Sequence, residues 1–278
     1  MSTDYAGHTI FITGAGSGIG YQCALVFANE GADIVATDVN VPALEQLKSE
    51  VEAVGRNCHI FSLDVRDEAS YEALVDQLES IGLIPDIAIN NAGLGVIAPF
   101  LETTTDDWRL TLDVNLLGVV LGCRLFAKLW IRQGISGRLV NIASMASLSP
   151  PANLSAYVAS KYAVEGFSEV LAMELEEFNI SISCVHPGVI NTAIVADSSR
   201  MKMSISEIAR LQRHYVEKGV HPRVVAHDIA SGIKRGEGTI LTGKDVGRTA
   251  LLKRLLPRKI FRKLLLNASR EMGYMPKK

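Results

Sequence analysis

Cysteine is scarce in this 278-residue chain, and the four cysteines lack the paired spacing of a disulfide framework or a metal site. They fall inside expected helices or strands, so we predict buried, reduced thiols and no metal. Aromatic residues make up only 6% of the chain, and no basic, aromatic-lined surface for a nucleic acid is evident. Apolar runs are far shorter than a bilayer span, and the first residues lack the pattern of a secretory signal, which predicts a cytoplasmic protein. The cysteines are Cys23, Cys58, Cys123 and Cys184.

Charge is distributed unevenly along the chain, although the formal net charge is only −2. Residues 251–278 carry nine lysines and arginines against the single acid Glu271, which makes that segment +8 and the remainder −10. We therefore expect one cofactor-binding and catalytic domain, residues 1–248, followed by a basic tail, residues 249–278.

Short strand-like runs alternate with longer helical patterns throughout the chain, and 48% of its residues are hydrophobic. This alternation predicts an α/β, doubly wound (Rossmann-type) domain. Its seven-stranded, mainly parallel sheet would have helices on both faces and a ligand crevice at the carboxyl ends of the strands. The expected strands are 8–12, 32–38, 58–63, 87–89, 139–143, 180–186 and 239–242, and the expected helices are 19–30, 41–54, 68–81, 106–133 and 155–178.

A glycine-rich turn joins the first expected strand to the first expected helix. Gly14, Gly18 and Gly20 follow the spacing Gly-x-x-x-Gly-x-Gly, with Ser17 and Ile19 between them. Glycines here let the backbone turn sharply and approach a pyrophosphate, while the free N–H groups of the new helix bind the anion. A glycine-rich connection without a ligand is the alternative. The strand before it, the helix after it and an acid at the end of the next strand favour a dinucleotide site.

That acid is Asp38, at a position where a carboxylate accepts hydrogen bonds from the adenosine ribose hydroxyls. A 2′-phosphate there would meet like charge, and neither Ser17 nor Val39 and Asn40 supplies a cation to neutralise it. An aspartate that caps the helix beginning near Val41 is an alternative compatible with the ribose role. The sequence therefore predicts NAD rather than NADP.

Tyr157 and Lys161 are four residues apart, so on a helix they share a face. A lysine ammonium beside a phenol lowers the phenol pKa toward working pH, which suits Tyr157 to act as general acid and base on an alcohol or carbonyl oxygen. Ser144 follows an apolar strand and can orient the same oxygen. Taken alone, such a pair is usually ordinary surface helix chemistry, and its position relative to the glycine turn is what favours catalysis.

In their order and spacing, these motifs resemble the short-chain dehydrogenase/reductase family over residues 8–243. The resemblance implies that Asp64 contacts the adenine amine and that Asn91 lies under the adenosine ribose. It also implies that Thr192 and the backbone near Ile190 hold the nicotinamide carboxamide. The expected cofactor-binding residues are Gly14, Ser17, Gly18, Ile19, Gly20, Asp38, Asp64, Val65, Asn91, Ala92, Gly93, Tyr157, Lys161, Pro187, Gly188, Ile190 and Thr192.

The predicted reaction is reversible hydride transfer between NAD and a secondary alcohol or ketone, with oxidation of the alcohol as the favoured direction. Tyr157 would take the hydroxyl proton and Ser144 would orient the oxygen. Lys161 would lower the tyrosine pKa and bind the nicotinamide ribose. By the resemblance, Asn115 would hold a water in a proton relay that reaches Lys161.

Three other functions are open to a chain with these motifs. An epimerase or dehydratase acting on nucleotide sugars would need a different glycine spacing and a large C-terminal substrate domain. A sensor or regulator that binds NAD without turnover, or a structural scaffold, would have no need of the complete catalytic set. Turnover with a panel of alcohols and ketones separates these classes.

The substrate loop is expected over residues 189–225, and apolar residues near the cleft predict a fairly apolar small molecule. They are Leu94, Val96, Ile97, Leu148, Ile194, Met201 and Met203. Basic residues in the loop leave a carboxylate-bearing hydroxy compound open as an alternative, although a solvated helix face over residues 206–218 accounts for them as well. These are Arg200, Lys202, Arg210, Arg213 and His214.

Two expected helices, 106–133 and 155–178, carry apolar residues on more than one face, including Leu117 and Val170. Apolar helix surface that a sheet cannot cover is usually buried against a second copy. In the resembling family these helices form a four-helix interface between subunits. We therefore expect a homodimer or homotetramer.

The tail has an apolar residue at every fourth position from Leu252 to Ala268, with Lys259, Arg262 and Lys263 on the opposite side. Pro257 interrupts this ladder, which predicts two short helices, outside the catalytic domain. Leucines opposite cations are typical of a helix that lies on a membrane surface, so peripheral membrane contact is one prediction. Docking on a neighbouring subunit, on the substrate cleft or on another partner is the alternative.

Overall fold

The computed structural model describes residues 4–192, 195 and 197–276. Seven strands form one sheet in the order β3-β2-β1-β4-β5-β6-β7, and every neighbouring pair is parallel. The chain order reverses between β1 and β4, where a doubly wound sheet opens a crevice at the carboxyl ends of its strands. The strands are β1 Thr9–Thr13, β2 Asp33–Asp38, β3 Cys58–Ser62, β4 Ile87–Asn90, β5 Gly137–Ile142, β6 Ile180–Pro187 and β7 Thr239–Thr242.

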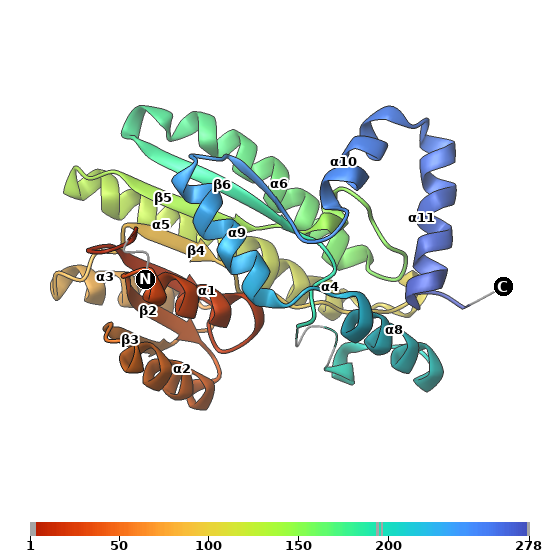
Figure 1. Cartoon of the computed structure of the whole chain (residues 1–278), viewed down its shortest axis with the longest axis horizontal. Coiled ribbons are helices and arrows are strands. Elements are labelled where there is room, and N and C mark those ends of the chain that lie inside the picture. Colours follow the sequence, from red (N-terminus) through yellow and green to blue (C-terminus); the bar gives the residue numbers. More distant parts are fainter. Residues whose placement is uncertain (1–3, 193–194, 196, 277–278) are drawn as a thin grey trace.

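Helices cover both faces of the sheet (Figure 1). Side chains along a strand point alternately to opposite faces, so both faces carry apolar side chains that the helices bury. Ile10 and Ile12 of β1 are buried in a core layer with α1, α2 and α9, whereas Phe11 is buried in a second layer with α3, α5 and α6. The helices are α1 Gly18–Asn29, α2 Val41–Ala53, α3 Glu68–Ser80, α4 Thr105–Leu112, α5 Gly118–Gln133, α6 Ser155–Glu174, α8 Ile205–Lys218, α9 Pro222–Lys234, α10 Val246–Leu255 and α11 Arg258–Met272.

The predicted fold class, a doubly wound α/β sheet of seven strands, is confirmed. The sheet is parallel throughout its described strands rather than mainly so. The helix expected over 106–133 is divided, because a π-helical turn, Asp113–Leu117, separates α4 from α5. The helix expected over 155–178 ends at Glu174, and Asn179, in a left-handed conformation, then turns the chain into β6.

The stretch Thr105–Gln133 is long and apolar enough to span a membrane by length and composition, yet 56% of its most apolar window is buried inside the protein. Phe126 and Trp130 of this stretch are fully buried in the layer between α5 and the sheet. Packing in the core therefore accounts for its hydropathy.

The tail forms two helices, α10 and α11, which Pro257 separates as the sequence predicts. The prediction that the tail lies outside the catalytic domain is wrong for its last turn, because Ser269 and Tyr274 are buried against the body of the protein. Lys253 of α10 also donates a hydrogen bond to the backbone oxygen of Ser147, at 2.8 Å. Polar contacts with the cleft, which the apolar ladder does not reveal, hold the tail there.

All four cysteines are buried and unpaired, which confirms the prediction of reduced core thiols. Burial raises the pKa of each thiol to about 12. Because the thiolate is the reactive form, these side chains pack as small apolar groups and are chemically inert near neutral pH.

Candidate active site

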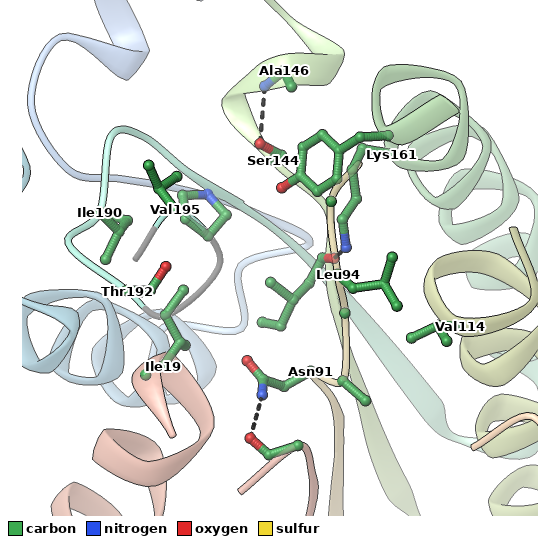
Figure 2. Close-up of a pocket in the computed structure, with 18 of the residues that line it drawn as sticks. Ile19, Asn91, Leu94, Val114, Ser144, Ala146, Lys161, Ile190, Thr192 and Val195 are labelled. Carbon is green, nitrogen blue, oxygen red and sulfur yellow. Dashed lines mark hydrogen bonds between the residues drawn. The ribbon is translucent and has the colours of Figure 1, made fainter. Parts of the chain in front are cut away.

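A cavity of about 450 Å³ opens at the carboxyl ends of the strands. Figure 2 shows Ser144 and Lys161 at one end of it, Asn91 at the other, and Thr192 on a third side. All but two of the residues predicted for catalysis or cofactor binding line this cavity. The two exceptions, Gly20 and Asn115, lie just behind the lining and contact residues within it.

The glycines of the turn are required by close packing. A Cβ on Gly20 would lie 2.4 Å from the Gly14 oxygen, and a Cβ on Gly14 would lie 2.8 Å from the Ala92 Cα. The Asn91 amide donates to the backbone oxygens of Thr13 and Gly14, at 2.9 and 3.0 Å, and so ties the turn to the end of β4. Glycine at these positions therefore lets the turn pack against the end of β4, and Gly14 and Gly18 line the cavity without side chains.

Ser17 stands at the N-cap of α1 and lines the cavity, but its side chain makes no capping hydrogen bond. The first N–H groups of α1 therefore have no side-chain cap. Gly18 and Ile19, the next two residues, also line the cavity. An uncapped helix N-terminus of this kind is suited to bind a phosphate or pyrophosphate.

Asp38 ends β2 beside the glycine turn. Its carboxylate accepts hydrogen bonds from the backbone N–H groups of Gly16 and Asn40, both at 2.9 Å. The alternative that Asp38 caps α2 is wrong, because Asn40 is the N-cap and accepts from Ala43 N, at 3.3 Å. Asp38 is thus half-buried and held on the cavity wall by two backbone donors.

Asp64 lines the same end of the cavity, followed by Val65 and Arg66. Its carboxylate accepts three side-chain hydrogen bonds from Arg66, at 2.9 and 3.0 Å from Nε and at 2.5 Å from Nη2. These bonds lower the pKa of Asp64, which keeps it ionised. Arg66 is a cation at this end of the cavity that was not predicted from the sequence. Its charge is already paired with the Asp64 carboxylate.

The segment after β6 closes the cavity on a third side. Pro187, Gly188 and Ile190 line it, and Gly188 N donates to Thr242 O, at 2.9 Å. Thr192 reaches the start of α1, where its Cγ2 lies 3.4 Å from the position of a Cβ built on Gly18. The loop after β6 and the glycine turn therefore face one another across a narrow gap.

Ser144, Tyr157 and Lys161 form the other end of the cavity. Ser144 follows β5, and its hydroxyl accepts a hydrogen bond from Ala146 N, at 3.0 Å. Lys161, one turn after Tyr157 on α6, donates to the backbone oxygen of Ile142, at 2.7 Å. Its Nζ lies 5.7 Å from the centre of the Tyr157 ring. A phenol, a hydroxyl and an ammonium are thus gathered around one point.

Burial governs the acid–base properties of this group. It raises the pKa of Tyr157 above its usual value, and a hydrogen bond with Ser144 partly opposes the rise. The same burial lowers the pKa of Lys161 to about 8. The prediction that the pKa of Tyr157 falls toward working pH is therefore wrong for the protein without a ligand, because loss of water raises that pKa.

Asn115 is fully buried in the π-helical turn between α4 and α5. Its amide accepts from Leu94 N and donates to Leu94 O, both at 2.8 Å, and also donates to Ser160 Oγ, at 3.1 Å. A Cβ on Gly93 would lie 3.4 Å from Asn115 Oδ1 and 3.7 Å from Lys161 Nζ. Asn115 therefore fixes the Leu94 segment and lies close to Lys161. Its role in holding a water of a proton relay stays a prediction.

The remaining wall of the cavity is largely apolar. Of the apolar residues predicted there, Leu94 and Ile97 line it, whereas Val96 and Met201 are buried beside it and Leu148 and Met203 are absent from the lining. Ile194 lies outside the described residues. The structure adds further apolar groups, which are Leu110, Val114, Met145, Pro151, Leu154, Val195 and Met272.

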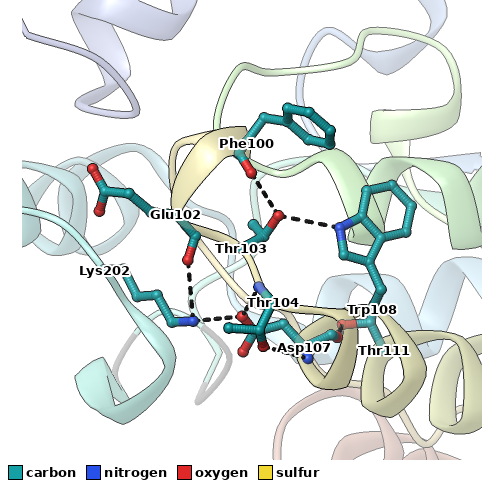
Figure 3. Close-up of polar contacts among 8 residues, drawn as sticks. All are labelled: Phe100, Glu102, Thr103, Thr104, Asp107, Trp108, Thr111 and Lys202. Atoms are coloured by element: carbon teal, nitrogen blue, oxygen red, sulfur yellow. Dashed lines mark hydrogen bonds and ion pairs between the residues drawn. The ribbon is translucent and has the colours of Figure 1, made fainter.

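Lys202, one of the cations considered for substrate binding, has a structural partner instead. Figure 3 shows it between the Asp107 carboxylate, at 2.5 Å, and the Glu102 backbone oxygen, at 3.3 Å. Lys202 N also donates to Ile97 O, at 2.8 Å. These contacts anchor the substrate loop to the segment that leads into α4.

The other cations of the loop differ in their access to the cavity. Arg200 lines it, half-exposed and paired with Asp197, at 3.4 Å. Arg210 donates to a backbone oxygen of the tail, and neither Arg213 nor His214 is part of the lining. Within the described chain, Arg200 is thus the basic loop residue positioned to meet a substrate carboxylate.

Several residues of the site carried no recognisable sequence signal. Thr13 accepts from Asn91 N and Ala92 N, both at 3.0 Å. Tyr215 of α8 and Tyr274 of the tail line the substrate end of the cavity. Tyr274 follows the last turn of α11, and a lone tyrosine after a glycine near the chain end does not indicate a cleft residue.

Comparisons with known proteins agree with this geometry. The family model described as short chain dehydrogenase matches residues 8–203. The chain is 37% identical to the Mycobacterium tuberculosis protein named "Probable oxidoreductase EphD" over 238 residues, which covers 83% of this chain and only 40% of that protein. It is 33% identical to cyclohexanol dehydrogenase of an Acinetobacter strain, over 76% of this chain and 84% of that enzyme.

A solved structure shares the fold over nearly its whole length. It is a short-chain dehydrogenase/reductase from Burkholderia phymatum in complex with NAD, with a TM-score of 0.82 and 29% identity. The match covers 95% of this chain and 97% of that one. The chain therefore belongs to the short-chain dehydrogenase/reductase family.

Proposed function

We propose that this chain is an NAD-dependent oxidoreductase that interconverts a secondary alcohol and a ketone of a fairly apolar small molecule. The proposal rests on one observation, which is that two sets of residues line the same cavity. Ser144, Tyr157 and Lys161 form one end, and the glycine turn with Asp38 forms the other. The first set suits proton transfer at an oxygen, and the second suits a dinucleotide.

The glycine-turn end fits NAD on three structural grounds. Gly14 and Gly20 pack too closely against Ala92 and Asn91 to carry side chains, which fixes the shape of the turn. Gly14 and Gly18 present bare backbone to the cavity, where a pyrophosphate can approach it. The helix behind the turn has no side-chain cap. Asp38 offers carboxylate oxygens to the ribose hydroxyls, and its charge opposes a 2′-phosphate.

The chemistry assigned to the chain is proton handling and orientation. When bound, NAD would supply the hydride acceptor, with Thr192 and the Ile190 backbone holding its carboxamide. Tyr157 takes the hydroxyl proton of the alcohol while Ser144 holds the same oxygen. Lys161 stabilises the developing phenolate and would hold the nicotinamide ribose when NAD is bound, and Asn115 supports exit of the proton.

The direct test is formation of NADH from NAD with a panel of cyclic and linear secondary alcohols, followed by absorbance. We expect turnover with apolar members of the panel, and ketone reduction when NADH is supplied. Tight NAD binding without turnover on any alcohol or ketone would instead identify a sensor or regulator.

Cofactor preference should depend on Asp38. The double change Asp38→Ala with Val39→Arg removes the repelling carboxylate and adds a cation for a 2′-phosphate. Because a charge-assisted hydrogen bond is worth about 1.5–3 kcal/mol, the ratio of kcat/KM for NADP over NAD should rise by about one to two decades. Asp106→Ala, which removes an exposed acid on α4, should leave the ratio unchanged. Preference of the unmodified protein for NADP would show that this acid is misread.

We expect a homodimer or homotetramer formed through α5 and α6. Leu117, in the π-helical turn before α5, is 50% exposed, and Val170 and Met173 of α6 are 48% and 70% exposed, which leaves apolar surface for a second copy. Light scattering at micromolar concentration should give at least the mass of a dimer, and Val170→Glu with Met173→Glu should reduce it to a monomer. A monomeric mass for the unmodified protein would contradict this interface.

The outward side of the tail remains open to a partner. Leu251, Leu255 and Ile260 are 56%, 67% and 51% exposed, close to the basic residues of α10 and α11. Peripheral contact with an anionic membrane and packing on a neighbouring subunit are both compatible with this surface. The protein is also centrifuged with anionic vesicles. Salt-sensitive pelleting with the vesicles would favour contact of the tail with a membrane, and no pelleting would favour packing of the tail on a neighbouring subunit.

A further inference from the structure

The end of the chain is folded into the substrate cleft by a defined helix stop. α11 ends at Gly273, whose φ of +101° favours glycine. Tyr274 N then donates back to Ser269 O, at 2.9 Å, which is the closing bond of a Schellman motif. A Cβ on Gly273 would lie 2.9 Å from Leu211 N of α8, so the turn fits tightly against that helix. This geometry directs Tyr274 inward, where it is 2% exposed.

Three further hydrogen bonds hold this turn against the body of the protein. Ser269 Oγ accepts from Ala152 N, at 3.1 Å, and Tyr274 O accepts from Asn153 Nδ2, at 2.5 Å. Arg210 of α8 donates to Met275 O, at 2.5 Å. The end of the chain is thus attached both to the segment before α6 and to α8, which lie on two sides of the cavity.

Tyr274 meets Tyr215 of α8 inside the cavity wall, and their hydroxyl oxygens are 2.5 Å apart. Both residues line the cavity that also contains Tyr157. Each phenol carries one hydrogen, and a bond between two phenols uses one of the two. No other hydrogen bond to either hydroxyl is present in the described part of the chain, so the pair keeps one donor that is not used by the protein, on two residues that line the cavity.

The surroundings of this donor are apolar. Tyr274 belongs to a cluster with Ile97, Leu154 and Met201, against which Tyr157 and Tyr215 also pack. A donor left without a partner in such a place costs about 1–3 kcal/mol, and an acceptor on a ligand would recover it. The catalytic tyrosine and the phenol pair are therefore polar groups that line one cavity and pack against the same apolar cluster.

We propose that Tyr215 and Tyr274 form a second recognition site that binds an uncharged oxygen of the substrate, a hydroxyl or carbonyl, other than the oxygen on the reacting carbon. This inference rests on the proposed function, because it takes Tyr157 as the site of reaction. It narrows the substrate class to an apolar alcohol or ketone that carries a further oxygen.

The chemistry of the pair favours a neutral oxygen over a carboxylate. Burial raises the pKa of Tyr215 to about 12 and also raises the pKa of Tyr274 well above its usual value, so negative charge is disfavoured at both phenols. Arg200, the basic loop residue in the lining, is paired with Asp197 and half-exposed. An anion at the phenol pair would thus lose its hydration without gaining a buried cation.

The test compares matched substrates with the full-length protein. Methyl ketones of increasing chain length are each assayed beside an analogue with a terminal hydroxyl and one with a terminal carboxylate. We expect the hydroxyl analogue of suitable length to have a kcat/KM at least tenfold above that of its plain ketone. Tyr215→Phe with Tyr274→Phe should remove this preference, whereas Tyr162→Phe, a change on the outer face of α6, should preserve it. Each single change should lower the preference less, because one donor hydroxyl remains.

The outcomes separate this inference from the proposed function. No reduction of any ketone would refute the proposed function itself. Reduction of plain and hydroxylated ketones at equal rates, or a preference that survives the double change, would overturn the second site while the function stands. Preference for the carboxylate series would also overturn it and would point to Arg200. Thermal melting of each variant shows whether the fold is retained, and Tyr274→Phe keeps the ring that fills the core.

Discussion

Replacing Tyr157 with phenylalanine will lower turnover by about 10²–10⁴-fold, the usual contribution of a positioned acid or base. The change removes one oxygen from a buried ring and keeps the packing of that ring against its cluster. NAD affinity should stay nearly intact, because the glycine turn and Asp38 lie at the other end of the cavity. Steady-state kinetics and calorimetric titration with NAD measure the two effects separately.

The matched control for this change is Tyr162→Phe. Tyr162 is the next tyrosine on α6, 37% exposed, and absent from the cavity lining. The Tyr162→Phe protein should retain full turnover. Turnover of the Tyr157→Phe protein close to that of the unmodified protein would remove the phenol from the mechanism.

Lys161→Met is expected to abolish turnover and weaken NAD binding while making the fold more stable at neutral pH. Lys161 is 4% exposed, and burial lowers its pKa from 10.5 to about 8. A shift of this size corresponds to about 3 kcal/mol of strain from holding a buried ammonium. Loss of the hydrogen bond to Ile142 O costs about 1 kcal/mol, so the free energy of unfolding at neutral pH should rise by about 2 kcal/mol.

The pH dependence identifies the cause of this gain. Between pH 8 and 10.5 the unfolded chain keeps the lysine proton and the folded protein loses it, so the unmodified protein becomes more stable as pH rises through this window. The Lys161→Met protein lacks this rise, so its advantage should disappear within this window. Above pH 10.5 the unmodified protein should be about 1 kcal/mol more stable, because it keeps the hydrogen bond to Ile142 O. Denaturant unfolding at several pH values, with Lys128→Met on the exposed face of α5 as control, measures it. A variant less stable than the unmodified protein at pH 7 would contradict the assignment.

The sequence predicted which residues gather at the glycine-turn end of the cavity, because the features involved are local. The glycine spacing, the acid at the end of β2 and the residues after β4 and β6 all follow strands whose carboxyl ends meet at one edge of the sheet. Knowing the fold class was therefore enough to bring Gly14, Asp38, Asn91 and Thr192 together. Their burial and hydrogen bonds required the structure.

The substrate end could not be read in the same way, because it depends on long-range packing. Tyr274 enters the cleft through a turn at Gly273 and contacts with Asn153 and Arg210, which are distant in the chain. The loop cations looked suited to a carboxylate, yet Lys202 is bound by Asp107. The pKa of Tyr157 was misjudged for a related reason, since burial is a property of the folded cavity and not of helix spacing.

The most direct test of the central claim follows one hydrogen atom. A secondary alcohol that the protein oxidises is prepared with deuterium on the carbinol carbon and incubated with NAD, and the NADH formed is analysed by mass spectrometry. The proposed function predicts that the deuterium appears on the nicotinamide ring of NADH, and that unlabelled alcohol in heavy water gives unlabelled NADH. Formation of NADH without the label, or with hydrogen taken from solvent, would contradict direct hydride transfer at this site.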